Sequence, residues 1–210
     1  MADSDPRFLK SHQRLHDTIF RLAEERDITT LSVSEIAREA KIDRTTFYLH
    51  YADRQEFFDA LGDALIEEFR VAGAIFDESA DPATDEVVPS GLPNVFWVTS
   101  KHPALYRQLL NSSASFSFRK RLEAHFAERF TQVWTRQGRV PPPGTAPIAV
   151  RARYAAAGTL GVLRMWLDGA AETTDAEELG AWMWDLSRPL HASTHAEEPV
   201  DGAADASEDQ

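Results

Sequence analysis

The stretch LSVSEIAREAKIDRTTFYLHYADRQEFF, residues 31–58 of this 210-residue chain, decides the fold that the sequence predicts. It opens with the form of a capping box, because Ser32 is followed three residues later by Glu35. In that motif the hydroxyl and the carboxylate bind backbone amides that are left free at the start of a helix. The short helix predicted after it has a buried side made of Ile36, Ala37 and Ala40.

A second short helix is expected after a turn at residues 41–43. Asp43 is a residue type that caps helix starts, and the helix predicted behind it covers Arg44 to about His50. A longer amphipathic helix over residues 14–27 precedes both, and Phe47 is expected to pack against it. Two short helices joined by a tight turn and braced by a longer helix form a helix-turn-helix.

The exposed side of the second short helix has side chains suited to DNA. Arginine can bind a guanine edge through two hydrogen bonds, and a threonine methyl can contact the methyl group of thymine. Tyrosine and threonine hydroxyls suit phosphate oxygens, which fix the register of a protein on DNA. Arg54, just beyond the helix, is placed to hold the adjacent phosphate backbone. The candidates on the helix itself are Arg44, Thr45, Thr46, Tyr48 and His50.

The segment IAREAKIDRTTFYLHYADRQEFF, residues 36–58, resembles the N-terminal DNA-binding domain of the tetracycline-repressor (TetR) family of bacterial regulators. The resemblance extends over about residues 10–60. It implies that the segment from Arg44 to Tyr48 is the recognition helix, and that Ser32, Tyr48 and Arg54 contact phosphates.

Two positions depart from the glycines that this family usually has. They are Lys41 in the turn and Asp27 after the first helix. A lysine at positive φ carries about 1 kcal/mol of strain, whereas aspartate tolerates that conformation better. Lys41 is also a cation beside the expected recognition helix, so it joins the candidate phosphate contacts.

A second interpretation of the same residues needs no DNA. Residues 7–60 would then be an ordinary helical bundle, in which Tyr48 and Tyr51 are partly buried packing residues. The helical pattern alone leaves both interpretations open, and the family resemblance favours DNA binding.

The net charge of −12 argues at first against a nucleic-acid partner. The charge is unevenly distributed, however. Residues 7–54 contain nine Lys/Arg and eight Asp/Glu, whereas the last twenty residues contain six acidic residues and no Lys or Arg. Because local charge decides what a surface binds, the N-terminal quarter of the chain remains able to bind DNA.

Composition sets the broad class of protein. A hydrophobic content of 43% is enough for a buried core, and the absence of cysteine excludes disulfides, thiolate metal sites and a cysteine nucleophile. The first ten residues lack the apolar segment of a signal peptide, and no run of about 18 apolar residues occurs. We therefore expect a cytoplasmic protein with no membrane contact.

Helical periodicity continues through the rest of the chain, and no strand pattern stands out, so the sequence predicts an all-α fold. A fourth helix should begin near Asp53, two short helices should divide at residues 102–103, and three longer helices should follow. The inner stripe expected for the fourth helix is Phe58, Leu61, Leu65 and Phe69.

The domain organisation expected from these patterns has four parts. A flexible N-terminus over residues 1–6 precedes the helix-turn-helix domain, residues 7–54. A helical ligand-binding and dimerisation domain follows over residues 55–190. Residues 191–210 are expected to be a disordered acidic tail, since they lack aromatic and nearly all large aliphatic side chains.

The resemblance implies a homodimer in which the last two helices of each chain form a four-helix contact. Ala157 and Gly161 lie one turn apart, and such small residues let helices approach closely. Apolar residues also recur at helical spacing in the last helix, where the core of the chain itself is the alternative explanation. The predicted interface consists of Ala157, Gly161, Met165, Trp166, Leu179, Trp182, Met183 and Leu186.

The resemblance also implies a pocket for a small-molecule effector within the larger domain. Aromatic residues supply apolar walls, although aromatic residues at helical spacing are equally what a plain core contains. The predicted lining is Phe96, Trp97, Tyr106, His125, Phe130 and Trp134. The segment AAAGTLGVLRMWLDG, residues 155–169, resembles a branch of the family that includes a dihydroxyacetone-kinase operon activator, but it does not identify the effector.

No cofactor or metal site is predicted. His12 and His16 have a spacing that can hold a metal ion, but no third ligand is evident and the zinc-protease pattern is absent. The chain also lacks a Gly-rich phosphate loop and a serine-nucleophile motif, so we do not expect an enzyme.

The sequence thus predicts a homodimeric transcriptional regulator that binds a palindromic DNA operator. We expect a repressor that a small-molecule effector releases from DNA. The alternative is a ligand-binding or assembly protein whose degenerate helix-turn-helix no longer binds DNA, an interpretation motivated by the acidic net charge and by Lys41 in the turn.

Overall fold

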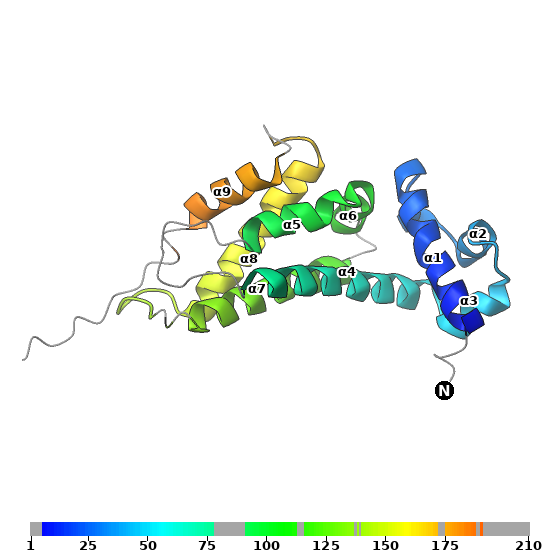
Figure 1. Cartoon of the computed structure of the whole chain (residues 1–210), viewed down its shortest axis with the longest axis horizontal. Helices are drawn as coiled ribbons and strands as arrows, with labels where there is room; N and C mark the ends of the chain where they lie inside the picture. The colour runs from blue at the N-terminus through cyan, green and yellow to red at the C-terminus, as the bar shows by residue number, and fades with distance from the viewer. Residues whose placement is uncertain are drawn as a thin grey trace, which may run out of the picture.

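The structure of the chain is a computed structural model. It describes residues 6–77, 91–112, 116–136, 138, 140–171, 175–187 and 190. Within these residues all regular structure is helical, which confirms the all-α prediction. The first helices form a head at one end of an elongated molecule, and the long helix α4 leads from this head into a larger helical body (Figure 1).

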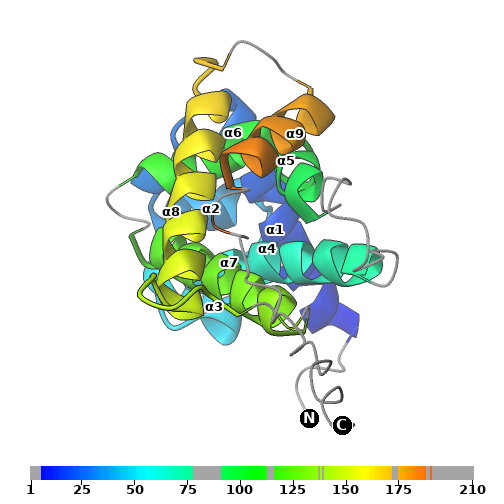
Figure 2. The ribbon, with the colours of Figure 1, turned by 90° about the vertical axis from the view of Figure 1, so that its left-hand side faces the viewer.

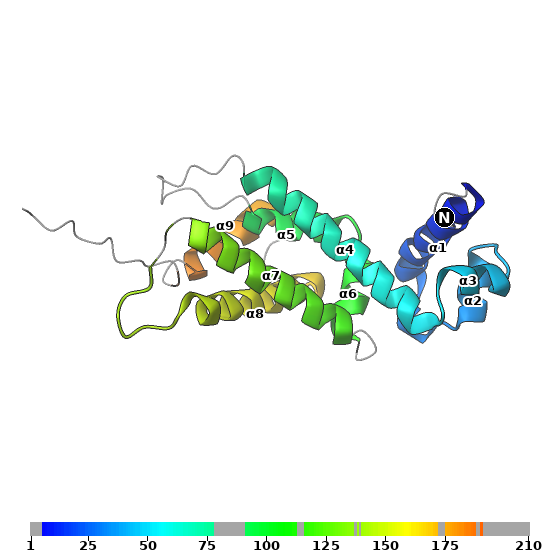
Figure 3. The same ribbon diagram turned by 90° about the horizontal axis from the view of Figure 1, so that it is seen from below.

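The head contains the predicted helix-turn-helix. Its elements are α1 (Pro6–Glu25), a short 3-10 helix η1 (Ile28–Thr30), α2 (Val33–Glu39) and α3 (Arg44–His50). The first helix begins earlier than its periodicity predicts, so Pro6 is helical rather than part of a flexible terminus. Seen from below, α2 and α3 lie together beside α1 at the tip of the molecule (Figure 3).

The body contains the remaining helices. They are α4 (Arg54–Asp77), α5 (Gly91–Ser100), α6 (Pro103–Asn111), α7 (Phe116–Arg136), α8 (Ile148–Leu167) and α9 (Ala176–Ser187). The predicted division at residues 102–103 is confirmed, since α6 begins at Pro103. Pro147 is the residue before α8 rather than part of its first turn. The expected tail, residues 191–210, lies outside the described residues.

The predicted capping box is present at the start of α2. The Ser32 backbone N–H donates to Glu35 Oε2 over 2.8 Å, and the Glu35 backbone N–H donates to Ser32 Oγ over 3.3 Å. Asp53 caps α4 in a similar way, because its carboxylate accepts from the Glu56 N–H at 2.9 Å. Asp43 occupies the cap position of α3, but its side chain makes no capping hydrogen bond, so that expectation is wrong.

The turn between α2 and α3 places Lys41 in the left-handed region, with φ of 54°. The Lys41 N–H donates to the Arg38 carbonyl at 3.1 Å, and the Ile42 N–H donates to the Ala37 carbonyl at 3.0 Å. This hydrogen-bond pair is the Schellman motif that commonly ends helices. Asp27, by contrast, has φ of −71°, so the positive φ expected for it is wrong. Its carboxylate instead accepts from the Thr29 N–H and starts η1.

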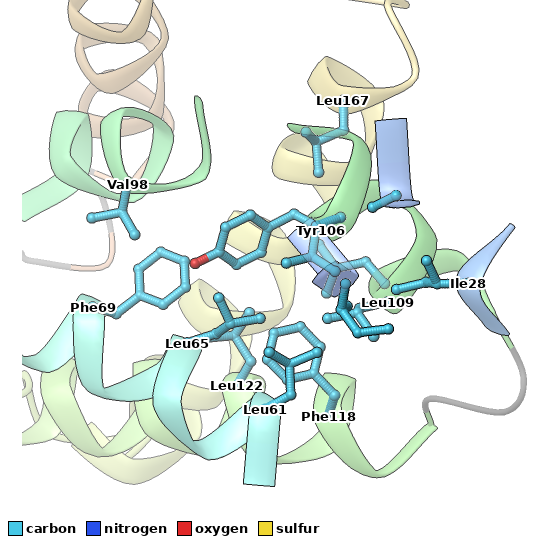
Figure 4. Close-up of a cluster of buried hydrophobic side chains, with 14 of the residues drawn as sticks. Ile28, Leu61, Leu65, Phe69, Val98, Tyr106, Leu109, Phe118, Leu122 and Leu167 are labelled. Atoms are coloured by element: carbon cyan, nitrogen blue, oxygen red, sulfur yellow. The ribbon is translucent and has the colours of Figure 1, made fainter. Parts of the chain in front are cut away.

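One continuous hydrophobic core joins the head to the body. It includes Leu15 and Phe47 in the head, and Leu61 and Leu163 in the body. On α4 the fully buried aromatic residue is Phe57, whereas Phe58 is only partly buried, so the inner stripe begins one position earlier than predicted. Figure 4 shows the part of this core where α4, α6 and α7 converge. The head is therefore packed on the body rather than tethered to it.

Two glycines allow body helices to approach closely. A Cβ atom added at Gly180 in α9 would lie 2.5 Å from Pro93 Cγ in α5. A Cβ atom at Gly62 in α4 would lie 2.9 Å from Phe118 Cδ2 in α7. Both distances are shorter than carbon atoms tolerate, so these two contacts depend on the missing side chain. Figure 2 shows α9 lying over α5 beside α8.

No helix within the described ranges is long and apolar enough to cross a membrane.

Candidate nucleic-acid interface

The two sides of α3 have opposite chemical character. Phe47 is fully buried, and its ring packs at 5.6 Å from the ring of Phe57 on α4. Arg44, Thr45 and Tyr48 lie on the other side and are exposed. Because Phe47 is held in the core, the orientation of the exposed side is fixed. The structure thus brings these three candidate DNA contacts onto one accessible face.

Tyr48 and Leu49 add apolar surface to this side of the head. The Arg44 guanidinium carbon lies 6.0 Å from the centre of the Tyr48 ring, which is the outer range of a cation–π contact. Leu49 is 72% exposed and was missed by the sequence analysis. The sequence does not indicate that Leu49 is exposed, because a leucine in a short helix is normally expected in the core.

Lys41 and Ser32, the candidate phosphate contacts that precede α3, differ in whether their polar groups already have a hydrogen-bond partner. Lys41 is exposed at the turn that precedes the helix. Ser32 is also exposed, but its hydroxyl lies 2.7 Å from Glu35 Oε2 within the capping box. The hydrogen bonds from Ser32 lower the pKa of the Glu35 carboxyl, so a negative charge remains beside this serine. Lys41 is therefore the better placed of the two for a phosphate.

Thr46, His50 and Arg54 are partly buried. The His50 ring packs 3.9 Å from the Phe8 ring, and its Nε2 lies 2.7 Å from Ser11 Oγ, so it faces α1. The Arg54 guanidinium donates to the Thr29 carbonyl. These side chains support the head from within, and the structure does not bring His50 and Arg54 onto the exposed face of α3.

Acidic charge in the head is partly neutralised by arginines. The Glu39 carboxylate lies 3.4 Å from Arg21, 3.2 Å from Arg26 and 3.4 Å from Arg38. These are exposed ion pairs, which contribute little to stability. They do reduce the repulsion that an unpaired carboxylate on α2 would exert on a phosphate backbone.

Three histidines meet where α1 packs on α3. The rings of His12 and His16 are stacked at 4.4 Å, and the rings of His12 and His50 lie 5.9 Å apart. Burial, and secondly the proximity of His12, lowers the pKa of His16 to about 4. His16 Nε2 lies 3.4 Å from the Tyr51 hydroxyl. Burial also raises the pKa of Tyr51 to about 12, with a smaller contribution from Glu56.

The three histidine rings form an aromatic cluster. No group of three or more His, Cys, Asp or Glu side chains that could hold a metal ion occurs among the residues the structure describes. Burial lowers the pKa of both His16 and His50, so the packing favours their neutral forms.

The residues predicted to line an effector pocket are not gathered in one place. Phe96 and Tyr106 are fully buried in the main core, while His125 is partly buried on α7. Phe130 and Trp134 stack on each other at 5.6 Å, and Trp134 belongs to a separate small cluster with Ala152 and Ala155. Trp97 is 53% exposed, so its prediction as a core-facing wall is wrong.

On the surface the Trp97 ring has a local partner. Lys101 Nζ lies 4.2 Å from the centre of the Trp97 ring, and Lys101 directly follows the last residue of α5. This cation–π contact holds the indole on the surface of the helix. The neighbouring Phe96 points into the core instead, where it meets Trp166 edge-on at 5.6 Å.

Tyr106 has a polar atom without a partner among the residues that the structure describes. Its side chain is fully buried, and its hydroxyl makes no hydrogen bond to any of these residues. Figure 4 shows the hydroxyl pointing toward Phe69, with Val98 nearby. A buried hydroxyl without a hydrogen bond is unfavourable by about 1–3 kcal/mol. Burial accordingly raises the pKa of Tyr106, because its ionised form would be still less favourable.

The predicted dimer residues divide into exposed and buried sets. Ala157, Gly161, Met165, Trp182 and Leu186 are exposed. Leu179 and Met183 are buried within the chain, so these two are not available to a partner as predicted. Trp166 is partly buried and packs on Phe96. The buried side of α9 therefore faces α5, and its opposite side is exposed to solvent.

The exposed face of α8 contains two residues that sequence reasoning missed. Tyr154 is 70% exposed, and Val150 lies one turn before it and is also exposed. With Gly161 and Met165 they recur at spacings of four and seven, which places them on one side of a helix. That periodicity was present in the sequence, but it could not be told from a buried stripe.

The fold and the site together define a class, that of helical proteins with an N-terminal helix-turn-helix on a larger helical domain. Residues 15–61 match the family model described as bacterial regulatory proteins, tetR family. The resemblance seen in the sequence is confirmed over these residues.

Solved structures with the same fold cover nearly the whole described chain. One is a protein from Syntrophomonas wolfei assigned to the TetR-family transcriptional regulators, with 14% identity, a TM-score of 0.67, and coverage of 90% of this chain and 98% of that one. Another is NalD of Pseudomonas aeruginosa, the secondary repressor of the MexAB-OprM multidrug efflux pump, with 19% identity, a TM-score of 0.61, and coverage of 84% and 96%.

A third is the dihydroxyacetone kinase operon activator DhaS, with 16% identity, a TM-score of 0.55, and coverage of 86% and 96%. At these identities the likeness concerns the fold alone. No match was found among curated proteins.

The histidine cluster leads to a pH prediction. The folded state holds His16 neutral down to about pH 4, whereas an unfolded histidine binds a proton below about pH 6.5. The unfolded state therefore binds more protons between these values. The free energy of unfolding should fall as the pH drops through this window, by up to about 1.4 kcal/mol per pH unit from this group.

His16→Gln should remove this part of the pH dependence, because glutamine does not titrate. Urea unfolding of the wild type and of the variant at pH 7.5 and pH 5 measures the difference. An identical loss of stability in both proteins between these pH values would contradict the role assigned to His16.

Proposed function

We propose that the protein is a homodimeric transcriptional regulator that binds a palindromic DNA operator through α3. The observation that carries this proposal is the division of α3 into a buried Phe47 and an exposed face with Arg44, Thr45 and Tyr48. Such a helix can enter a major groove while its other side stays in the core. The match of residues 15–61 to the tetR family supports it.

Roles can be proposed for individual residues of the head. Arg44 and Thr45 would contact base edges, since they lie at the start of the recognition helix. Lys41 and Tyr48 would contact phosphates on either side of them. In this arrangement residues 7–54 are the DNA-binding domain and residues 55–190 are the ligand-binding and dimerisation domain.

The strain at Lys41 does not favour the alternative of a degenerate head. The two Schellman hydrogen bonds accommodate the left-handed lysine without disturbing α2 or α3. The local charge around α2 is also balanced by the arginines that meet Glu39. The two features that motivated that alternative are therefore compatible with DNA binding.

A dimer is proposed through the outer sides of α8 and α9. These sides present exposed apolar residues, among them Tyr154 and Met165 on α8 and Trp182 and Leu186 on α9. Contiguous exposed apolar surface commonly marks an interaction site. Gly161 lies within this surface, where a Cβ atom would meet nothing of the same chain within 4 Å, so a partner helix has room to approach.

An effector is proposed to bind in the body next to Tyr106. The unpartnered hydroxyl of this residue is a hydrogen-bonding group in apolar surroundings, which is how ligand sites fix the orientation of a small molecule. Binding there would shift α6, which contains Tyr106, and α4, whose Phe69 packs against the Tyr106 ring. DNA and effector would then antagonise each other, with a coupling of about 1–3 kcal/mol.

We propose repression as the outcome of DNA binding, because a protein bound over a promoter excludes other proteins from it. The proteins with this fold include both a repressor, NalD, and an activator, DhaS. A reporter placed behind the operator, with and without the protein, distinguishes the two directions.

The first test of the proposal concerns sequence specificity. DNA bound by the wild type is selected from random sequences, and variants are then measured on the selected site and on unrelated DNA. Arg44→Ala should weaken binding to the selected site by about 1–3 kcal/mol and relax the preference at one position of each half-site. Lys41→Ala should weaken both DNAs nearly equally and reduce the salt dependence. An equal loss on both DNAs for Arg44→Ala would refute base reading by this residue.

The second test concerns assembly. Leu186→Glu and Gly161→Glu each place a carboxylate against its symmetry mate across a two-fold axis, so both should produce monomers. Val140→Glu is a matched control, because Val140 is exposed in the loop between α7 and α8. Light scattering at constant protein concentration measures the mass. Dimers in both interface variants would place the interface elsewhere.

The third test concerns the effector. A compound found by screening for release of the protein from its selected DNA should bind Tyr106→Phe more weakly, by about 1–3 kcal/mol, because the hydrogen bond to the hydroxyl is lost. DNA affinity without the compound should not change. Thr135→Val, which removes an exposed hydroxyl on α7 away from the proposed interfaces, is the control. If Tyr106→Phe binds the compound as tightly as the wild type does, the effector site is not next to Tyr106, and if no compound releases the protein from DNA, effector-driven release is wrong.

A further inference from the structure

The side chain of Gln108 on α6 makes three hydrogen bonds to the backbone of the head. Gln108 Oε1 accepts from the Ile28 backbone N–H at 2.8 Å. Gln108 Nε2 donates to the carbonyl oxygens of Ala23 at 2.8 Å and of Arg26 at 3.0 Å. The amide thus joins the end of α1 and the start of η1 to a helix of the body.

Two of the groups that Gln108 binds are backbone carbonyls at the end of the first helix. The last carbonyls of a helix have no partner within that helix, and Ala23 lies in the last turn of α1 while Arg26 follows its last residue. The Ile28 N–H belongs to the first residue of η1. A side chain about 80 positions further along the chain therefore closes the connection that leads into α2.

The other side of α6 is fixed to the end of α8. Arg107 Nε donates to the Leu167 carbonyl over 2.6 Å. Asn111 accepts from Arg164 Nε at 2.8 Å and donates to Asp168 Oδ1 at 3.0 Å. Directional hydrogen bonds thus link α1 and η1, through α6, to the helix whose outer face is exposed for a second copy.

The type of contact matters for the geometry of the head. Apolar packing is favourable but non-directional, so the shared core by itself tolerates small rotations of one helix pair against another. Hydrogen bonds weaken steeply when their angles change. Three of them on one planar amide define both the distance and the angle between α6 and the end of α1.

We propose that Gln108 is a positioning residue that sets the orientation of the DNA-reading helices relative to α8, and so the separation of the two recognition helices in the dimer. The proposal rests on the proposed DNA-binding function only for its second half. Its first half, that the amide orders the end of α1 and η1, applies to the free protein.

The variant that tests this is Gln108→Glu, which preserves size and shape. The carboxylate can still accept from the Ile28 N–H, but it cannot donate to the two carbonyls. It also places a negative charge at the C-terminal end of α1, where the helix dipole disfavours it. Gln132→Glu is the control for the added charge, because Gln132 is exposed on α7 and its hydrogen bond among the described residues is to Glu128 of the same helix.

Amide hydrogen exchange of the full-length protein tests the first half. In Gln108→Glu, amides of residues 22–31 should exchange about tenfold faster than in the wild type, the effect of losing one well-made interaction. Amides of α7 and the middle of α8 should be unchanged in Gln108→Glu. In Gln132→Glu the amides of residues 22–31 should exchange as in the wild type, because any effect of the new carboxylate beside Glu128 stays within α7. Unchanged exchange over residues 22–31 in Gln108→Glu would overturn the proposal.

Half-site spacing tests the second half. The wild type is measured on its selected DNA and on the same DNA with one base pair inserted or removed between the half-sites. We expect it to prefer one spacing, and Gln108→Glu to lose that preference while its salt dependence is unchanged. A protein that is merely less stable would instead lose affinity at all spacings alike.

The two experiments separate the possible failures. If the wild type selects no DNA, the proposed function fails, while the exchange result still decides whether Gln108 orders the junction. If the wild type shows a spacing preference that Gln108→Glu shares in full, DNA binding stands and the positioning role is wrong.

Discussion

The burial of Phe47 is the constraint on which the surface of the head depends. α3 has only seven residues, too few to be stable by helix propensity alone, so its position is set by packing. Phe47 supplies this packing through contacts with Tyr51 and Phe57, whose rings lie 5.7 Å and 5.6 Å away. Once that ring is fixed, the residues on the opposite side of the helix have no choice of direction.

The same principle operates on a larger scale in the body. Because one core extends from α1 to α9, a change of volume in one part shifts neighbouring helices as units. The close contacts at Gly62 and Gly180 leave little space for α4 to move against α7, or for α5 to move against α9. A ligand that enters such an interior acts on the whole arrangement, and α6 is the helix that lies between the interior and the head.

Local sequence patterns predicted most of the helices and the capping box, because these depend on near neighbours, and the family resemblance implied the positive φ of Lys41. They failed where distant contacts decide. Trp97 and Phe96 are adjacent aromatic residues, and only the packing of α5 assigns one to the surface and the other to the core. Leu179 and Met183 had the pattern of an interface, but the fold uses them against α5. The hydrogen bonds of Gln108 could not be predicted from the sequence, since its partners lie about 80 residues away along the chain.

The left-handed lysine at the turn shows how stability and charge oppose each other in this head. A glycine at position 41 would relieve about 1 kcal/mol of backbone strain. Lys41→Gly is therefore the substitution expected to stabilise the folded state. The same change would delete a cation at the edge of the exposed face. Lys41 is thus a site where thermostabilisation and the affinity of the head for an anionic polymer are expected to be optimised by different residues.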